Sequence, residues 1–386
     1  MLDVAIIGGG PGGLYTGLQL AEAGYRVAVF EEHDGIGQPV HCTGVLAGEA
    51  FAEFGLPQSC VLNELATARF FGPGGAELSY TTPRTEAIVV DRAALDRSLA
   101  ERATAAGVEL HLGARVIGVE RESRCMVVQR ASERVQARAV VLACGASYGL
   151  QRRLGLGMPP VSLNSAQLEL PASRSGDVEV YFGADVAPRG FAWTVPVMRP
   201  AGHFVRVGLM GHGDPSASFR RFFERMAPSW GIPLADPPEP RKRFLPLASL
   251  PRTFGDRLLA VGDAAGLVKP TTGGGIYYSL VSARLAAETL APALAADRLD
   301  ARTLSTFQDR WRQRLGPELR AQLALRMLAQ RLSDDEIDSL FELARTNGVM
   351  PLIHRAAQFN QHRHLIAELF RHIPARRLLF RRLLPV

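Results

Sequence analysis

The sequence predicts an α/β protein with a second domain of α+β character and a helical C-terminal region. A glycine-rich turn lies between two buried-strand patterns near the N-terminus, and alternating strand patterns follow from about residue 161 to 249. From about residue 276 onward the pattern is almost wholly helical. At 386 residues the chain can bury a large core, so we expect two interlocked domains followed by a terminal region.

The first unit has the order strand, glycine turn, helix and strand. Residues 3–8 predict a buried strand, residues 14–23 a helix, and residues 26–32 the next parallel strand. Later strands are expected within residues 87–120 and 134–146, with a helix from about Arg92 to Ala106 between them. This order is typical of a Rossmann-like nucleotide-binding domain.

The turn after the first strand carries the pattern GxGxxG at Gly8, Gly10 and Gly13. Such a motif needs a tight turn at the first glycine, close approach of the backbone to a pyrophosphate at the second, and close packing of helix on strand at the third. Glu31 closes the second strand and can accept hydrogen bonds from a ribose hydroxyl. The sequence therefore predicts dinucleotide binding.

The middle of the chain predicts a second, antiparallel sheet. The runs "DVEVYF", "GFAWTVPV" and "HFVRVGLM" alternate as strands do, and residues 198–202 are expected to form a hairpin turn. Residues 234–240 are rich in proline and predict a connector, after which "DRLLAVGD" (256–263) returns to a buried parallel strand.

We accordingly expect three regions in the chain. The expected divisions are a discontinuous cofactor-binding domain of residues 1–55, 85–160 and 250–295; a substrate domain of residues 56–84 and 161–249; and a C-terminal helical region of residues 296–386.

Composition limits the function classes and the compartment. The four cysteines are scattered without CxxC or metal-like spacing, which argues against a zinc site or a disulfide framework and fits a reducing compartment. We find no signal peptide and no apolar run of about 18 to 20 residues, so a cytoplasmic protein is expected. The net charge of +6 is mostly arginine interleaved with acids, and without a recognised nucleic-acid motif it gives little support to nucleic-acid binding.

The C-terminal tail has its own charge pattern. Residues 371–386 carry five arginines and no acid among leucines. Such a segment can lie on the anionic inner face of a membrane as a peripheral contact, and it can equally be a plain packing helix.

Several motifs together resemble the geranylgeranyl reductase family of FAD-dependent enzymes, within the group that shares the p-hydroxybenzoate hydroxylase fold. The resemblance spans nearly the whole chain. The motifs that carry it are "VAIIGGGPGG" (4–13), "PVHCTG" (39–44), "VDRAALDRSLAERA" (90–103), "FAWTVP" (191–196), "VGDAAGLVKPTTGGGIYY" (261–278) and "LSDDEID" (332–338).

The resemblance implies FAD as the cofactor and assigns residues to it beyond the first glycine turn. Asp263 would bind the ribityl chain, and Gly274, Gly275 and Ile276 would begin a helix beside the flavin ring, where the positive helix end favours negative charge on the reduced flavin. Lys269 lies in the same stretch, either adding positive charge there or standing solvated on the surface. The other residues implied to contact FAD are Arg92, Val116, His41, Cys42 and Gly44.

The same resemblance implies a reductase that hydrogenates double bonds of a polyprenyl lipid, quinone or diphosphate. Cys42 is the candidate catalytic residue, by shaping the site, tuning the flavin or assisting proton delivery. Phe191, Trp193 and Pro196 would line the substrate channel, although a core strand with alternating aromatics explains the first two almost as well. The electron donor is open between NAD(P)H and a ferredoxin-like protein.

Two departures from the family patterns bear on rival functions. Cys144 stands where the wider hydroxylase group has an aspartate tied to reduction by pyridine nucleotide, which weakens NADPH as a direct donor. No lysine precedes Lys242, so the early lysine that flavin halogenases use has no counterpart. A flavin monooxygenase or halogenase, and a non-catalytic isoprenoid-binding flavoprotein, remain the alternatives.

Overall fold

The computed structural model describes residues 1–234, 237–346 and 348–380, and the chain divides into two compact units. Unit 1 comprises residues 1–40, 92–162 and 246–319, and unit 2 comprises residues 41–91, 163–245 and 320–386. Both units are therefore discontinuous, as the interlocked sequence patterns indicate. The units differ in extent from the three regions expected above, since residues 41–55 group with unit 2 and the C-terminal helices are shared between both units.

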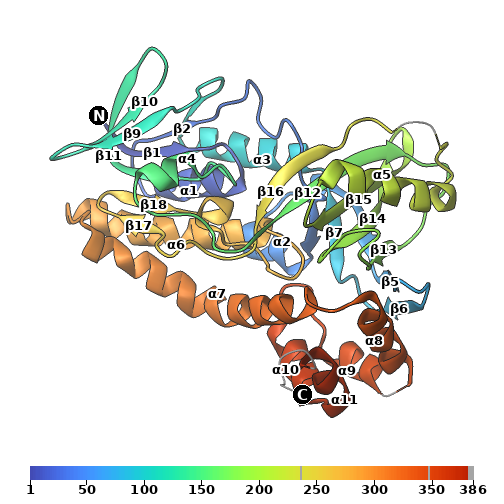
Figure 1. Ribbon diagram of the computed structural model, residues 1–386. Coiled ribbons are helices and arrows are strands. Elements are labelled where there is room, and N and C mark those ends of the chain that lie inside the picture. The colour runs from blue at the N-terminus through green and yellow to red at the C-terminus, as the bar shows by residue number, and fades with distance from the viewer. Residues whose placement is uncertain (235–236, 347, 381–386) are drawn as a thin grey trace. The chain divides into compact units, whose positions relative to one another are not determined.

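Unit 1 is built on an eight-stranded mixed sheet, with helices packed against it (Figure 1). Its main path runs β17-β18-β11-β1-β2-β8, and β9 and β10 extend from β11 as an antiparallel arm. The strands are β1 (Leu2–Ile7), β2 (Val27–Phe30), β8 (Glu109–His111), β9 (Gly118–Arg121), β10 (Met126–Gln129), β11 (Arg134–Leu142), β17 (Phe254–Gly255) and β18 (Leu258–Ala260).

The central strands of this sheet are parallel and largely buried, as their continuous apolar runs predict. Strand β1 pairs with β2 and β11, and β11 pairs with β18, all in parallel register. The helices of the unit are α1 (Pro11–Glu22), α3 (Arg92–Ala105), α4 (Gly149–Arg153), the short helix η3 (Gly262–Ala265), α6 (Ile276–Ala295) and the first part of α7 (Ala301–Ala329). The Rossmann-like prediction is thereby confirmed, with α1 beginning at Pro11 rather than residue 14 because proline suits the first helical position.

Unit 2 contains a seven-stranded sheet in the order β16-β12-β15-β14-β13-β5-β6. The expected hairpin is present, because β14 ends at Arg199 and β15 begins at Gly202 in antiparallel register. The strands are β5 (Thr67–Phe71), β6 (Glu77–Thr81), β12 (Ser162–Pro171), β13 (Val178–Tyr181), β14 (Phe191–Arg199), β15 (Gly202–Gly211) and β16 (Arg241–Pro246). The connector of residues 234–240 includes residues 235–236, which lie outside the described part.

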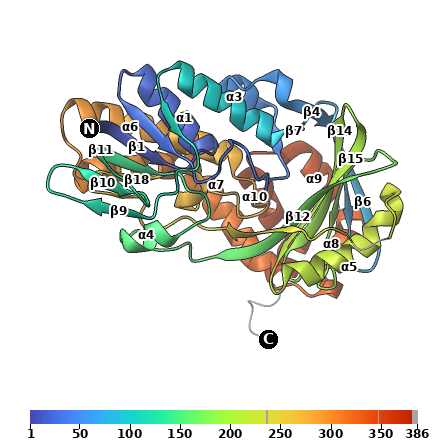
Figure 2. The same ribbon diagram turned by 90° about the horizontal axis from the view of Figure 1, so that it is seen from above.

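A small three-stranded sheet, eight helices and the end of α7 complete unit 2 within its described residues, and Figure 2 labels β4 and β7 of the small sheet. The strands are β3 (Val45–Ala47), β4 (Val61–Leu65) and β7 (Ala87–Val90). The helices are α2 (Glu49–Phe54), η1 (Gln58–Cys60), α5 (Pro215–Met226), η2 (Ala227–Trp230), α8 (Asp334–Thr346), α9 (Val349–Ala356), α10 (Arg363–Arg371) and α11 (Ile373–Phe380).

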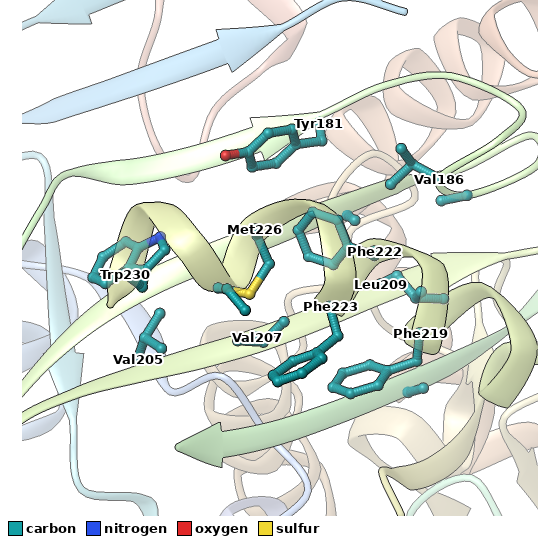
Figure 3. Packing of buried hydrophobic residues seen from close by; sticks show 14 of the residues in the cluster. Tyr181, Val186, Val205, Val207, Leu209, Phe219, Phe222, Phe223, Met226 and Trp230 are labelled. Atoms are coloured by element: carbon teal, nitrogen blue, oxygen red, sulfur yellow. The ribbon is translucent and has the colours of Figure 1, made fainter. Parts of the chain in front are cut away.

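The two faces of the large sheet in unit 2 are different. Helix α5 presents Phe219, Phe222 and Phe223 to one face, where they pack among buried aliphatic side chains of β14 and β15 (Figure 3). The opposite face of β14 carries Trp193 and Val195, which pack with residues of β4 and β7. Because side chains alternate along a strand, β14 separates two apolar clusters, one under α5 and one against β4 and β7.

The basic tail is described only in part. Helix α11 buries Ala375 and Leu379, and the ring of Phe380 lies edge-on to that of Phe370 with centroids 5.4 Å apart. Residues 381–386, which hold two of the five arginines, lie outside the described part, so contact with a membrane surface stays a prediction. None of the helices in the described ranges combines the length and apolar character that crossing a membrane requires.

Candidate functional site: two glycine turns and an aromatic sheet face

The first glycine turn leaves no room for side chains at two of its three glycines. A Cβ on Gly13 would lie 2.0 Å from the carbonyl oxygen of Gly8, and a Cβ on Gly8 would lie 2.3 Å from that of Ala143. Gly8 also has φ +112°, which only glycine adopts readily. Gly10, by contrast, faces open space with no atom within 4 Å of an added Cβ. The turn is thus closed toward the sheet and open on the side of Gly10.

The open side coincides with the N-terminus of α1. Gly10 is the N-cap residue of this helix and has no side chain to accept a hydrogen bond from the first amides. Uncapped amides and the positive helix end together favour a phosphate. The geometry at Gly10 is therefore that of a pyrophosphate cradle.

Glu31 follows β2 directly and is held beside the glycine turn. Its Oε2 accepts a hydrogen bond from the amide of Gly9 at 2.7 Å, and its Oε1 accepts one from the amide of His33 at 3.0 Å. These bonds fix the carboxylate at the end of the strand, where the sequence places the ribose acceptor. The contact of His33 with Glu31 was not predicted from the sequence. The only signal for it is that His33 lies two residues after Glu31.

The second glycine turn lies between η3 and α6. A Cβ on Gly275 would meet Oδ1 of Asp263 at 2.6 Å, so the aspartate lies directly against the turn. Gly275 caps α6 without a side-chain hydrogen bond, and Gly274 is exposed. Tyr148 donates its hydroxyl proton to the carbonyl oxygen of Asp263 at 2.5 Å, which fixes the backbone of η3. The structure thus brings Asp263, Gly274, Gly275 and Ile276 together.

The two glycine turns lie next to each other within unit 1. A Cβ on Gly12, in the first turn of α1, would lie 3.5 Å from Val261 and 3.6 Å from Ser279 of α6. Gly262 donates its amide proton to Oγ of Ser282 at 2.9 Å, which ties η3 to α6 as well. Two helix N-termini, each with glycine as its N-cap residue, therefore lie close together, although 264 residues separate Gly12 from Ile276 in the sequence.

Arg92 and Val116 lie elsewhere in unit 1. Arg92 begins α3, and its Nη2 donates to both carboxylate oxygens of Asp96 at 2.7 and 2.9 Å. Burial raises the pKa of Asp96. Val116 is half-buried in the segment after β8, where Ala114 donates its amide proton to the carbonyl oxygen of Glu31 at 2.7 Å. This segment therefore runs beside Glu31, as the expected contact with adenine requires.

Burial decides whether Lys269 is solvated and whether the Cys144 thiol is charged. Lys269 is only 3% exposed, and its aliphatic chain lies against Gly274, so a solvated surface lysine is excluded. Burial raises the pKa of the Cys144 thiol to about 11, and Gln151 donates an amide proton toward its sulfur at 3.4 Å. The thiol is neutral at neutral pH and does not reproduce the negative charge of the aspartate it replaces.

The loop of His41, Cys42 and Gly44 belongs to unit 2. The amide of Gly44 donates to Sγ of Cys42 at 3.3 Å, which closes the loop on itself. Arg206, only 2% exposed, donates to the carbonyl oxygens of Thr43 at 2.6 Å and Val90 at 2.9 Å. The buried guanidinium of Arg206 thus anchors the backbone of the loop that contains Cys42.

Arg206 is itself held by Glu169 of β12. Glu169 accepts hydrogen bonds from Arg206 at 2.8 Å and from Arg199 at 2.6 and 3.0 Å. Burial opposes ionisation of this carboxyl, but the two arginines outweigh it and hold its pKa below the usual value. The ion network is charge-assisted and geometrically specific.

The predicted channel residues do not all share one face of β14. Phe191 and Trp193 lie on the same face with ring centroids 5.6 Å apart, whereas Pro196 falls on the opposite face with Ala192. Phe182 lies 6.1 Å from Phe191, and Phe341 of α8 lies 6.1 Å from Phe182. We call Phe341, Phe182, Phe191 and Trp193 the aromatic row.

The motif "LSDDEID" attaches α8 to this sheet. Asp338 accepts the amide of Gly74 at 2.9 and 3.0 Å, and Asp334 accepts that of Ala184 at 3.0 Å. Ser333 and Glu336 form a capping box that begins the helix. The motif therefore positions Phe341 within the aromatic row.

The sequence comparisons agree with this geometry. The chain is 30% identical over 357 residues to the digeranylgeranylglycerophospholipid reductase of Methanocaldococcus jannaschii, with 88% of this chain and 90% of that protein covered. It is 32% identical over 360 residues to digeranylgeranylglycerophospholipid reductase 2 of Methanothermobacter thermautotrophicus, with the same coverage. The chain belongs to the geranylgeranyl reductase family of FAD-dependent oxidoreductases.

Two family descriptions match parts of this geranylgeranyl reductase family member. Pyridine nucleotide-disulphide oxidoreductase matches residues 2–164, and lycopene cyclase protein matches residues 219–346. The crystal structure of a geranylgeranyl bacteriochlorophyll reductase-like protein from Thermoplasma acidophilum shares the fold with a TM-score of 0.85, 21% identity and 99% coverage of both chains.

The residues of unit 1 fit FAD, the cofactor of this family. The open side of Gly10 accommodates a pyrophosphate, and the carboxylates of Glu31 and Asp263 lie at the two turns where hydroxyl groups of the cofactor are expected. Their placement at the cofactor, and that of His41, Cys42 and Gly44 in unit 2, remains a prediction. Among the described residues, no group of three or more His, Cys, Asp or Glu is arranged to hold a metal ion.

Replacing Gly10 and Gly13 with alanine will separate cofactor binding from folding. Gly10→Ala should fold normally, because its φ of −84° suits alanine and no protein atom meets the new Cβ. The methyl group occupies the pyrophosphate space, so FAD affinity should fall about ten- to hundredfold, for a clash of about 1–3 kcal/mol. Gly13→Ala should instead lose folded protein. Flavin titration and circular dichroism measure the two effects, and unchanged FAD affinity in Gly10→Ala would contradict the cradle.

Replacing Arg206 will test the support of the Cys42 loop. Arg206→Gln leaves Glu169 with one partner and two carbonyls unsatisfied, so the free energy of unfolding should fall by about 3–5 kcal/mol. Arg199→Gln is the matched control: this arginine is 28% exposed, and its loss should cost about 1 kcal/mol. Urea unfolding of both variants compares them, and equal losses would show that Arg206 has no special role.

Proposed function

We propose that this protein hydrogenates carbon–carbon double bonds of a polyprenyl chain carried by a lipid, a quinone or a diphosphate. The aromatic row is the observation that carries the proposal, because it offers an apolar surface on the face of β14 opposite the structural core. Each methylene buried against such a surface contributes about 0.8 kcal/mol. The relatives named digeranylgeranylglycerophospholipid reductase support a substrate of this chemical class.

In this proposal the residues of the chain bind and orient the substrate and the cofactor. The aromatic row holds the isoprenoid chain, and the two glycine turns hold FAD with its pyrophosphate at Gly10. Bound FAD, when reduced, supplies the hydride for one alkene carbon. Isolated alkenes are poor electrophiles, so positioning and the exclusion of water must provide much of the rate.

Cys42 is proposed to act where a proton must reach the second alkene carbon, directly or through an ordered water. Its sulfur is fixed by the amide of Gly44, and its loop is fixed by Arg206. A half-buried thiol in a rigid loop can either hold a proton at Sγ or shape the surface beside it. Cys42→Ser keeps a donor of similar size and Cys42→Ala removes it, so their comparison separates the two roles.

The electron donor is proposed to be a ferredoxin-like protein or NAD(P)H. The neutral thiol of Cys144 favours a donor other than a directly bound pyridine nucleotide, since it cannot supply the charge of the aspartate. Peripheral contact with a membrane would bring the enzyme to a lipid substrate. The proposed electron donor and the proposed membrane contact both follow from the proposed function.

The decisive experiment is anaerobic reduction followed by mass spectrometry. The flavin-loaded protein is reduced with dithionite and mixed with geranylgeranylated phospholipid, menaquinone or geranylgeranyl diphosphate. We expect a mass gain of one H2 per reduced double bond in one of these classes. Oxygen-dependent hydroxylated or halogenated products would establish a monooxygenase or halogenase instead, and a flavin that none of the prenyl compounds reoxidises would indicate a non-catalytic binding protein.

The aromatic row predicts a selective effect on substrate binding. Phe191→Ala should raise KM for the prenyl substrate about tenfold or more, because a buried phenyl ring contributes about 1.5–3 kcal/mol. Phe71→Ala is the control, since Phe71 stacks on Tyr181 on the face that packs against α5. It should lower stability and leave KM unchanged. Equal KM values for the Phe191 variant and the wild type would show that the aromatic row does not bind the substrate.

A further inference from the structure

Arg326, in the last turn of α7, is a buried cation in unit 2. Only 7% of its surface is exposed. Its Nη2 donates to the carbonyl oxygen of Arg189 at 2.7 Å, and its Nε is buried without an acceptor among the described residues. A buried guanidinium ordinarily has a carboxylate partner, because an uncompensated charge is costly to desolvate. No carboxylate among the described residues lies within salt-bridge distance of Arg326.

The groups nearest to Arg326 increase the positive charge. Burial lowers the pKa of Arg326 to about 10, so the side chain is still protonated at neutral pH. Partial burial lowers the pKa of His212, and the charges of Arg189 and Arg326 lower it further. Arg189 and His212 are exposed at the edge of the buried guanidinium. Among the described residues, three basic side chains thus lie close together with no acidic side chain paired to Arg326.

The loop that presents these groups is built under constraint. Arg189 adopts φ +57°, a left-handed conformation that is unusual for arginine. The next residue, Gly190, packs so closely on β15 that an added Cβ would lie 1.7 Å from the carbonyl oxygen of Met210. His212 follows the end of β15 and donates its amide proton to the carbonyl oxygen of Pro188 at 2.9 Å. The backbone therefore fixes Arg189 and His212 in place.

The cationic cluster adjoins the aromatic row. Phe191, the first residue of β14, follows Gly190 directly and pairs with Met210. Arg326 of α7 binds the carbonyl oxygen of Arg189, two residues before Phe191, and Phe341 of α8 contacts Phe182 of the aromatic row. A charged end and an apolar row thus share one surface, which is the pattern that an amphiphile with an anionic head requires.

We propose that Arg326, Arg189 and His212 form a subsite for a phosphate or diphosphate group, placed so that an attached isoprenoid chain follows the aromatic row. The guanidinium of Arg326 donates to a phosphate oxygen through its remaining exposed edge, and the exposed Arg189 and His212 donate from the rim. Guanidinium groups suit phosphate because several N–H donors point in fixed directions. The anion site itself does not depend on the hydride chemistry, but its link to the chain rests on the proposed function.

The test measures binding to the oxidised, FAD-loaded protein by isothermal titration calorimetry. The probes are geranylgeranyl diphosphate, uncharged geranylgeraniol, and inorganic diphosphate alone. We expect wild-type protein to bind the diphosphate about ten- to hundredfold tighter than the alcohol, in proportion to hydrogen bonds made to a charged group. Arg326→Met should abolish that difference and leave the affinity for geranylgeraniol unchanged.

Two further variants keep the test independent of folding. Arg189→Asn removes a rim charge, tolerates the left-handed backbone and preserves the carbonyl that accepts from Arg326, so it should lose part of the preference. Arg320→Met removes an exposed cation from the same helix and should change nothing. If inorganic diphosphate also binds wild type and not Arg326→Met, the subsite accepts the free anion as well as a head group.

The opposing outcomes are distinct. Equal affinity of wild type for geranylgeranyl diphosphate and geranylgeraniol would overturn the subsite, and so would an equal loss for both ligands in Arg326→Met, which would indicate a structural role at the helix end. Failure of wild type to bind either prenyl compound would count against the proposed function. In that case the inorganic diphosphate arm alone decides whether the anion site exists.

Discussion

The contact between the first turn of α1 and the start of α6 is the constraint on which unit 1 depends. A Cβ added at Gly12 would lie at van der Waals distance from Val261 and Ser279, so the contact has room for a methyl group, and a longer side chain would meet α6. Both helices have glycine as the N-cap residue, and the N-terminal end of a helix favours negative charge. A cofactor with a pyrophosphate at one end and a ring that gains negative charge at the other matches this pair of helix ends.

A second constraint, in unit 2, is electrostatic. Arg206 holds the backbone of Thr43 and Val90 while Glu169 neutralises its charge. Arg206 lies on β15 and is bound by Glu169 of β12, so its hydrogen bond to the carbonyl oxygen of Thr43 anchors the loop that contains Cys42 to these two strands. Loops that carry function are usually positioned by such a scaffold. In this protein the scaffold is a charged side chain that reaches from the sheet into the loop.

The parts of the fold that were predictable are those with a local physical signal. Gly8 and Gly13 are required by contacts within a few residues, and the continuous apolar runs of β1 and β2 reflect burial on both faces. The aromatic pair Phe191 and Trp193 follows from alternation along one strand. The same alternation puts Pro196 on the other face, a consequence of the strand period that family resemblance alone did not convey.

The remaining features depend on long-range contacts. Phe341 reaches the aromatic row from a helix about 150 residues beyond Phe191 in the chain, and Asp338 holds Gly74 from about 260 residues away. Arg206 and Arg326 resemble any of the 44 basic residues in the sequence, because burial is a property of the fold and not of the neighbouring residues. Motifs such as "LSDDEID" signalled the family, but their physical role as a helix clamp became visible only through the groups they bind.

Within the described part of unit 2, Arg326 is a buried cation with no carboxylate partner, and its burial therefore carries an energetic cost. Glu179, which is also buried in this unit, receives hydrogen bonds from Arg69, Tyr181, Thr194 and Trp230, so its charge is fully satisfied. Among the described residues, Arg326 has one carbonyl acceptor, and Arg189, which supplies it, has a left-handed backbone. Folding alone would favour an apolar side chain at this position, because it would remove the desolvation cost. If Arg326 binds an anionic ligand, the retained positive charge has a function, because the bound anion offsets the desolvation cost of the buried guanidinium.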